Sequence, residues 1–321
     1  METKAINERL VLGQLTAFSG EELKNLAMAM GLELPSSWNK ARMAERMVRW
    51  MSECPVSAAG WFSHPLLKEL RDLAGKTAVE EPIRLERRAP VMAEQLLAVG
   101  LAQWQGSALL IWPLAFAIAR ASDEAQEKAL FEMDLCAEGM LCAYGILEEN
   151  EWLERLCALF PDWNRAIAEQ CLRARLELLC VAQRLTRQGL RWWADAQMDE
   201  PLKWIGWYLT NRDMTYRQYL KDEYRLAALT GWIQEPPEKK ALMDLLIAHG
   251  ERREDAEDLL TMDMLERQNH PECGELPDFI AHIVQNHPDE EANVRTLYLA
   301  HCRHMALWKC KGDTLENRER A

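Results

Sequence analysis

The stretch "FSGEELKNLAMAMGLELPSSWNKARMAERMVRWM", Phe18 to Met51, predicts two helices joined by a short extended segment. Ser19 and Glu22 have the spacing of a capping box, so we expect the first helix to begin at Ser19. Pro35 disfavours helical backbone in the residue before it, which predicts an extended link between the helices. The stretch therefore predicts a helix, a loop and a second helix.

Two apolar stripes at helical spacing support this assignment. The first stripe consists of Leu23, Leu26, Ala27 and Met30. The second helix, with Ser37 or Asn39 as its cap, has an inward stripe of Met43, Met47, Trp50 and Met51. The basic side chains of this helix fall largely outside the stripe and are Lys40, Arg42, Arg46 and Arg49. We therefore expect a small module with a basic outer face.

The rest of the chain has the same helical pattern. The 321 residues are 49% hydrophobic and 28% charged, which is ordinary for a folded globular protein. No alternating run of strand length stands out, and the apolar run "ALLIWPLAFAIA" at 108–119 predicts a buried helix. We predict an all-α fold, with the small N-terminal helix-loop-helix module followed by a larger multi-helix bundle or array.

Proline-rich and charged stretches suggest the domain boundaries. The segment "EEPIRLERRAP" at 80–90 has no apolar periodicity and predicts an extended or exposed link. The adjacent prolines of "EPPEKK" at 235–240 exclude a helix interior. The predicted division is a module at 1–54, a connector at 55–90, a helical core domain at 91–234, and a C-terminal helical region with a polar tail at 235–321.

Charge and cysteine content restrict the compartment and the partners. The net charge of −13 repels phosphates at long range, so any nucleic-acid contact requires a locally basic patch. The nine Cys are scattered and several lie in apolar stretches, which is typical of reduced cytosolic protein. The N-terminus "METKAINERL" has no apolar signal sequence. We expect a cytoplasmic protein with no cofactor and no membrane contact.

The segment "LGQLTAFSGEELKNLAMAMGLELPSSWNKARMAERMVRWM" at 12–51 resembles the Rho N-terminal-like and SAP-type domains of nucleic-acid-associated proteins. The matching elements are "L..LT" at 12–16, "ELKNLAMAMGL" at 22–32, and a Lys followed by an apolar-striped helix at 40–51. The resemblance implies that the loop and the second helix contact a DNA or RNA backbone. The residues it nominates are Ser36, Ser37, Asn39, Lys40, Arg42, Arg46 and Arg49.

The basic helix has an alternative interpretation without nucleic acid, and the RNA-binding mode of the family does not transfer to this chain. A basic helix face is commonly solvated surface, or it packs against an acidic patch of the same chain. In the Rho termination factor, after which the first of these domains is named, an RNA-binding barrel follows the module, whereas a helical chain is expected here. The segments 140–156 and 297–317 resemble a broader group of bacterial helical proteins, and the second is similar to a recurring C-terminal "W..KG.T..E" ending of that group. That resemblance implies no activity.

The stretch "CLRARLELLCVAQRLTRQGLRWW" at 171–193 combines arginines with tryptophans. As a helix it would place Arg173, Arg184, Arg187 and Arg191 on roughly one face. Arginine beside aromatic side chains can bind single-stranded nucleic acid. The favoured interpretation is that these arginines pair with carboxylates while the tryptophans fill the core.

The C-terminal region gathers several histidines and cysteines, namely His270, Cys273, His282, His287, His301, Cys302, His304 and Cys310. Their spacing fits no standard zinc site, so we expect surface histidines with a packed cysteine and no metal. No phosphate loop, dinucleotide fingerprint, nucleophile elbow or HExxH motif is present in the sequence.

We therefore predict a non-catalytic binding protein rather than an enzyme. Its N-terminal module contacts a nucleic-acid backbone, and its Trp-rich helical body binds a protein partner or self-associates. The alternative is a purely protein-binding or structural protein with no nucleic-acid contact.

Overall fold

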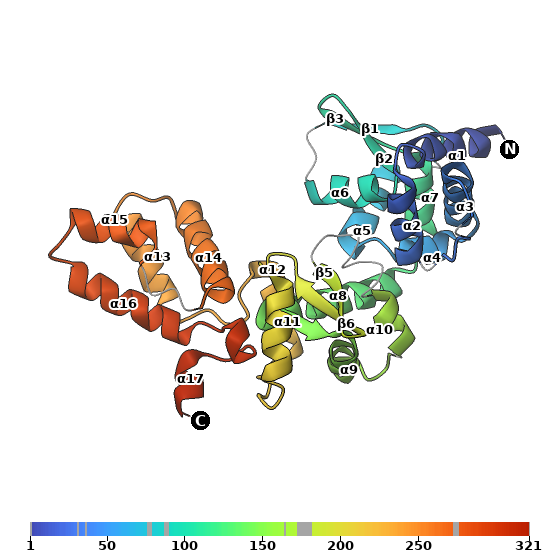
Figure 1. The fold of residues 1–321 in the computed structure, drawn as a ribbon. Helices are drawn as coiled ribbons and strands as arrows, with labels where there is room; N and C mark the ends of the chain where they lie inside the picture. Colours follow the sequence, from blue (N-terminus) through green and yellow to red (C-terminus); the bar gives the residue numbers. More distant parts are fainter. Residues whose placement is uncertain are drawn as a thin grey trace. The chain divides into compact units, whose positions relative to one another are not determined.

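The computed structural model describes residues 2–30, 32–35, 37–75, 79–86, 90–163, 165–171, 182–271 and 276–320 (Figure 1). The chain forms two compact units, Met1–Asp134 with Phe160–Val181, and Leu135–Leu159 with Ala182–Ala321. Each unit has a buried hydrophobic cluster of its own. The division predicted from the sequence, with boundaries near residues 54, 90 and 234, stays a prediction.

The first unit begins with helices and continues into a small sheet. Its elements are α1 (Glu2–Leu15), α2 (Gly20–Ala29), α3 (Lys40–Glu53), α4 (Pro55–Ala59), α5 (His64–Ala74), β1 (Ile83–Glu86), α6 (Pro90–Ala98), β2 (Ala102–Gln105), β3 (Ala108–Ile111), α7 (Pro113–Ala121), the first part of α8 (Glu124–Tyr144), and α10 (Arg165–Cys171).

The N-terminal helices begin where the sequence predicts. Ser19 Oγ accepts a hydrogen bond from the Glu22 amide at 3.1 Å, and the Glu22 carboxylate accepts one from the Ser19 amide at 2.5 Å. The Asn39 side chain caps α3 by accepting a hydrogen bond from the Arg42 amide at 3.0 Å. Both caps satisfy amides that the first helical turn leaves without a partner, and both predictions are confirmed.

The predicted apolar stripes are the buried faces of α2 and α3. The residues less than a tenth exposed include Leu23, Leu26, Ala27, Met30, Met43, Met47 and Met51. Trp50 is half-buried and stacks on Trp61 with ring centroids 4.5 Å apart. Because its apolar side packs against α1, α2, α4 and α7, α3 turns its opposite side to solvent.

A three-stranded antiparallel sheet makes the prediction of a purely helical chain wrong. Strand β3 lies between β1 and β2, and β2 joins β3 through a two-residue turn with φ of +63° at Gly106. Glycine adopts this angle without strain, as hairpin turns require. The run 108–119, predicted as one helix, is β3 followed by α7, which begins at Pro113. Proline suits the first turn of a helix but cannot continue an inner strand.

The predicted connector at 55–90 is more structured than the sequence suggests. Helices α4 and α5 lie within it, and Leu66, Leu67 and Leu70 of α5 are buried. In the segment 80–90, the half-buried strand β1 has the extended backbone that was expected there.

The second unit contains the remaining elements. After the end of α8 these are β4 (Ile146–Glu148), α9 (Glu149–Leu159), β5 (Ala182–Arg187), β6 (Leu190–Asp195), α11 (Pro201–Thr210), α12 (Lys221–Thr230), α13 (Lys239–Ala248), α14 (Arg253–Asn269), α15 (Asp278–Asn286), α16 (Glu291–His304), the 3₁₀ helix η2 (Trp308–Cys310) and α17 (Leu315–Arg320).

A second antiparallel sheet has the order β4-β6-β5. Strands β5 and β6 form a hairpin whose turn residues, Gln188 and Gly189, have φ of +53° and +77°. Trp193 of the central strand faces Leu147 on one side and Arg184 on the other, and its side chain is fully buried. In each sheet the second strand of the hairpin, β3 or β6, is the central strand. A strand from earlier in the chain, β1 or β4, pairs with its other edge.

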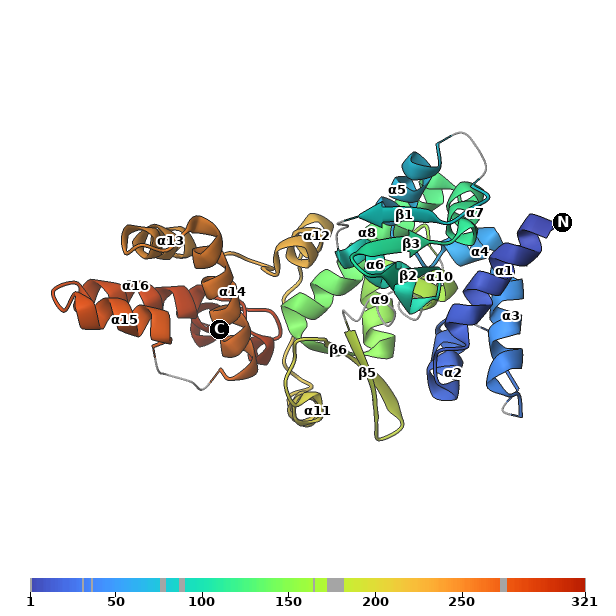
Figure 2. The same cartoon turned by 90° about the horizontal axis from the view of Figure 1, so that it is seen from above.

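The C-terminal part of this unit is helical. Figures 1 and 2 show α13, α15 and α16 running beside one another, and they enclose apolar side chains such as Leu242, Ile283 and Tyr298. Within the part of the chain that is described, no helix combines the length and apolar character needed to cross a membrane. The chain is thus mostly helical, with two small sheets, rather than purely α-helical.

Candidate nucleic-acid interface

The solvent side of α3 carries the basic residues that the sequence nominated. The exposed members are Lys40, Arg42, Arg46 and Arg49 on the helix, with Ser37 and Asn39 just before it. Ser36, also nominated, lies outside the described residues. The helical period therefore brings the four cations to the side opposite the buried methionines, as expected.

Intramolecular ion pairs do not hold these cations. Among the described residues, no carboxylate lies within 4.0 Å of the charged groups of Lys40, Arg42, Arg46 or Arg49. Other basic residues of the same unit are paired: Arg71 lies 2.6 Å from Glu127, and Lys128 lies 2.8 Å from Glu124. The cations of α3 are therefore available to an external anion.

A tryptophan that the sequence interpretation omitted lies beside this face. Trp38 packs in part against the core, and its ring centroid is 5.1 Å from the Arg42 guanidinium carbon. Such a contact orients an arginine without neutralising it. Its position between Ser37 and Asn39, in the segment nominated for binding, was the available signal.

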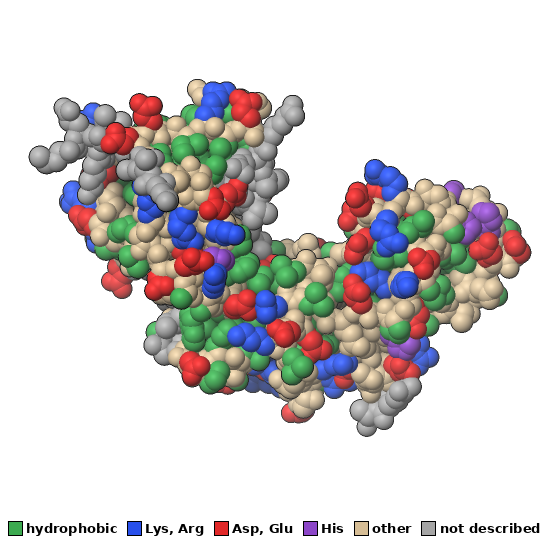
Figure 3. Space-filling view, turned by 180° about the vertical axis from the view of Figure 1, so that it is seen from behind, with side chains coloured by type: hydrophobic (Ala, Val, Ile, Leu, Met, Phe, Trp, Pro, Cys, Tyr) green, Lys and Arg blue, Asp and Glu red, His purple; other side chains and the backbone are tan. Residues whose placement is uncertain are grey.

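The basic character of this face is local. On the face drawn in Figure 3, acidic and basic side chains are interspersed rather than separated. On α3 itself, the first turn directs its free amides toward its N-terminus, which favours anions. Glu45 is the exposed acidic residue among the four cations. The arrangement can hold a few phosphates of a flexible or linear polyanion.

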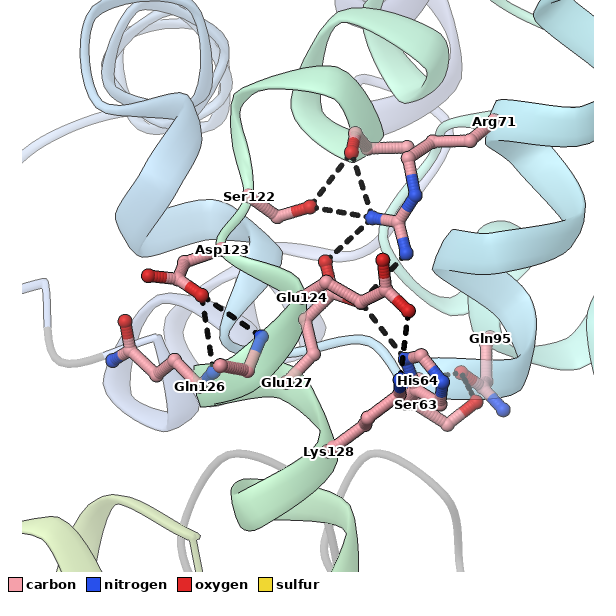
Figure 4. A network of polar contacts seen from close by, with 12 residues as sticks. Ser63, His64, Arg71, Gln95, Ser122, Asp123, Glu124, Gln126, Glu127 and Lys128 are labelled. Atoms are coloured by element: carbon pink, nitrogen blue, oxygen red, sulfur yellow. Dashed lines mark hydrogen bonds and ion pairs between the residues drawn. The ribbon is translucent and has the colours of Figure 1, made fainter.

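A second polar cluster of this unit joins α5 to the start of α8 (Figure 4). The Arg71 guanidinium donates hydrogen bonds to both Glu127 carboxylate oxygens, at 2.6 and 2.9 Å, and His64 Nδ1 lies 3.0 Å from the same carboxylate. Burial raises the pKa of Glu127, but the bonds from Arg71, Ser122 and His64 outweigh it and the pKa is lowered. Glu127 is thus a buried carboxylate that connects two helices.

This cluster does not assemble a nucleophile. Ser63 Oγ, at the start of α5, is hydrogen-bonded to the Gln95 side chain at 3.1 Å. Among the described residues no Ser or Cys side chain hydrogen-bonds His64. The contacts of the cluster connect α5 to α8 through a buried carboxylate.

In the described part of the arginine-rich stretch, residues 182–193, the chain forms a hairpin and not the helix that the sequence predicted. Arg173 lies outside the described residues, and Arg184, Arg187 and Arg191 lie on the β5–β6 hairpin. Arg191 lies 2.9 Å from the buried Glu149. The prediction of a helical arginine face is wrong, because β6 pairs with a strand distant in sequence that local periodicity does not reveal.

The other arginines of the hairpin are also engaged. Arg187 donates a hydrogen bond to the Leu202 carbonyl, and the Arg184 guanidinium lies 6.0 Å from the Trp193 ring centroid. Burial of Trp192 and Trp193 and the ion pair of Arg191 with Glu149 agree with the favoured interpretation of this stretch. Arg187 differs from it, because it bonds a backbone carbonyl rather than a carboxylate.

The C-terminal histidines do not converge. Cys273 lies outside the described residues, and within the described chain no group of three or more His, Cys, Asp or Glu side chains could hold a metal ion. His304 pairs with Glu238 at 2.9 Å and with Glu316 at 2.7 Å. His301 is fully buried, so the expectation of surface histidines is wrong at this position.

Comparison of the chain with protein-family models, with curated proteins and with solved structures found no match. Assignment of a function therefore depends on the geometry and the charges of the chain itself.

Proposed function

We propose that this protein binds the phosphate backbone of DNA or RNA through the exposed face of α3, without acting as an enzyme. The observation that supports the proposal most directly is the set of four exposed cations on α3 that no described carboxylate pairs. Exposed Lys and Arg side chains at a helix start supply the long-range charge and the donors that phosphate contact requires. Binding of this kind has little sequence preference.

The number of cations sets the expected salt dependence. If Lys40, Arg42, Arg46 and Arg49 each neutralise one phosphate, the slope of log K against log salt is about −3.6 for duplex DNA. Affinity then falls roughly 150-fold between 50 and 200 mM salt. For a single strand the smaller charge density gives a slope of about −2.8 and a loss of roughly 50-fold.

Fluorescence anisotropy with labelled single- and double-stranded DNA and RNA, over a salt series, tests the proposal. The double variant Lys40→Glu/Arg46→Glu removes two contacts, so the duplex slope should fall by about 1.8 as the affinity drops. The matched control is Lys68→Glu/Lys128→Glu, which makes the same charge change on exposed positions of α5 and α8. Equal binding by both double variants, or no binding by the wild type at 50 mM salt, would refute the proposal.

Protein binding by the second unit is the second candidate function. The large tryptophans are unsuited to it, because Trp152, Trp193 and Trp308 are fully buried. The exposed leucines of α12 are better suited, since Leu226 and Leu229 are 54% and 67% exposed and lie one turn apart. Sedimentation velocity compares wild type with Leu226→Asp/Leu229→Asp. A concentration-dependent dimer that the variant loses supports self-association through α12, and an unchanged distribution argues against it.

A further inference from the structure

A polar cavity of about 620 Å³ lies within the second unit. Its wall includes Glu151 and Arg155 of α9, Trp192 of β6, Tyr216 of the loop after α11, and Lys311. The volume lies in the range of about 300–1,000 Å³ that small-molecule sites occupy. Charged side chains and aromatic rings in one concave surface are the composition that such sites use to orient a ligand.

Lys311 is the most buried cation of this wall. Its residue is 3% exposed, and its Nζ donates a hydrogen bond to the Met214 carbonyl at 2.8 Å. The same nitrogen lies 4.5 Å from the ring centroid of Tyr216 and 5.4 Å from that of Tyr208. Among the described residues no carboxylate lies within 4.0 Å of this ammonium group.

A second buried lysine of the same unit provides the contrast. Lys239 is 4% exposed, and its Nζ lies 2.6 Å from Glu235 and 3.5 Å from Glu257. Burying a charge costs free energy unless an opposite charge or several hydrogen bonds compensate it. The charge of Lys239 is compensated by two carboxylates of the protein. The charged group of Lys311 contacts one carbonyl and two aromatic rings instead.

A second cation reinforces the positive character of the buried wall. The Arg155 guanidinium carbon lies 4.3 Å from the Tyr216 ring centroid, so this ring contacts both Arg155 and Lys311. Arg155 pairs with Glu151 at 2.9 Å, and the Glu151 side chain is 37% exposed. Two cations and one carboxylate around a single tyrosine leave one positive charge without a counter-charge.

The rest of the lining is mixed in charge and more open to solvent. Arg212 and Asp213 are exposed, and Glu148 is half-buried. With one cation and two carboxylates they carry a net charge of −1, but they lie in a more polar environment, where charges are screened. The buried Lys311 therefore determines which charge the site prefers in a ligand, and it favours an anion.

The backbone around Lys311 is held in an unusual conformation. Lys311 has φ of +51° and is followed by Gly312 at +82°, where a Cβ would lie 2.8 Å from the Tyr144 ring. A non-glycine residue in this region is strained, and such strain is concentrated at functional sites. Hydrogen bonds from the Lys311 amide to the Trp308 carbonyl, 2.9 Å, and from the Arg217 amide to the Lys311 carbonyl, 3.1 Å, fix it.

This conformation accounts for the "W..KG.T" spacing at 308–314. Trp308 is fully buried and donates a hydrogen bond to the Cys142 carbonyl at 3.0 Å, and the Lys-Gly pair makes the left-handed turn against Tyr144. Thr314 Oγ1 accepts a hydrogen bond from the Asn317 amide at the start of α17. These residues fix the backbone at Lys311 and thereby position its amine.

Burial also lowers the pKa of Lys311; the nearby Glu151 raises it in part, and Arg155 lowers it further. A bound anion next to the amine would favour its protonated form and so raise the pKa of Lys311 again.

We propose that this cavity is a binding site for a small organic anion, a carboxylate or a phosphate monoester, whose acidic group forms an ion pair with Lys311. The tyrosines and Trp192 supply apolar walls for the rest of the ligand. This site is independent of the phosphate-binding face of α3, which lies in the first unit.

Isothermal titration calorimetry of the full chain tests the proposal with benzoate, phenyl phosphate and neutral benzamide as probes. Wild type should bind one or both anions and prefer them at least about tenfold over benzamide, because a charge-assisted pair in a buried site is strong. The two anions distinguish a carboxylate site from a phosphate site.

The variants are Lys311→Met, which keeps the aliphatic stem, and Lys240→Met, which removes an exposed lysine of α13 outside the cavity. The first should lose at least about tenfold in anion affinity, and the second should bind as wild type does. No preference of wild type for the anions over benzamide would overturn the proposal, even if Lys311→Met fails to fold. Equal anion affinity in folded Lys311→Met would overturn it as well.

Discussion

Acid should weaken the C-terminal helices of the second unit through one histidine. His301 of α16 is fully buried, and neither of its ring nitrogens has a hydrogen-bond partner among the described residues. Its ring lies 5.9 Å from Trp232 and 6.5 Å from Tyr298, centroid to centroid. Burial lowers the pKa of His301 from 6.5 to about 4, although Glu238 raises it in part. The folded protein therefore holds this ring neutral.

The direction and size of the effect follow from linkage. Because the folded pKa lies below the unfolded value, the stability gained from a neutral ring is complete above about pH 6.5 and is lost as the pH falls toward 4. A shift of this size corresponds to about 3 kcal/mol in total, at 1.36 kcal/mol per unit. At pH 5 the loss is about 2 kcal/mol, or roughly a 30-fold rise in the opening equilibrium.

Hydrogen exchange with peptide-resolved mass spectrometry is the suitable assay, because it reports local opening in a chain of two units. After correction for intrinsic exchange rates, peptides of α13, α14 and α16 should lose about 2 kcal/mol of protection between pH 7.5 and pH 5. His301→Leu should abolish most of this loss. The exposed His282→Leu is the control and should keep it.

His304, on the same helix, makes a contribution to stability that has the opposite pH dependence. The hydrogen bond with Glu238 raises the pKa of His304, so the stability from that pair is present at low pH and lost as the pH rises through the folded pKa. The difference between His301→Leu and His282→Leu cancels this contribution. Equal loss of protection in both variants would show that the buried ring is not the acid-sensitive group.

Three further substitutions test the packing. Gly139→Ala should destabilise the protein by about 3 kcal/mol or more in urea unfolding, because its Cβ would collide with the Tyr224 carbonyl oxygen; a change under about 1 kcal/mol would contradict the packing of α8 on α12. Glu127→Gln should cost about 3 kcal/mol, since it leaves Arg71 partly buried without its carboxylate; thermal unfolding at neutral pH measures this, and an unchanged midpoint would contradict it. Ser19→Ala should cost about 1 kcal/mol and lower the exchange protection of α2 alone; a uniform loss across the first unit would argue against a local cap.

The N-terminal helices could be predicted because their determinants are local. A capping residue lies three positions from its partner, and an apolar stripe repeats within one helix, so Ser19, Asn39 and the methionines of α3 carried the information. The exposed cations of α3 followed from the same periodicity. Nothing distant in the sequence was required.

The sheets could not be predicted in the same way. Strands of three to six residues are too short to show a clear alternation, and each central strand is stabilised by a partner that lies far along the chain. The available signal was the Gln188-Gly189 pair, because a glycine in a two-residue turn is typical of a hairpin. The arginine spacing in the same stretch happened to fit a helix, and it was misleading.

The two proposed sites place positive charge in opposite environments, and this difference makes them separable by experiment. The cations of α3 lie in water, where salt screens them within about 8–10 Å, so their binding must weaken steeply as salt rises. Lys311 lies inside the second unit, where an ion pair is screened much less. A salt series should therefore abolish nucleic-acid binding while anion binding in the cavity persists. If both respond equally to salt, the anion is held at the surface, and the cavity is not its site.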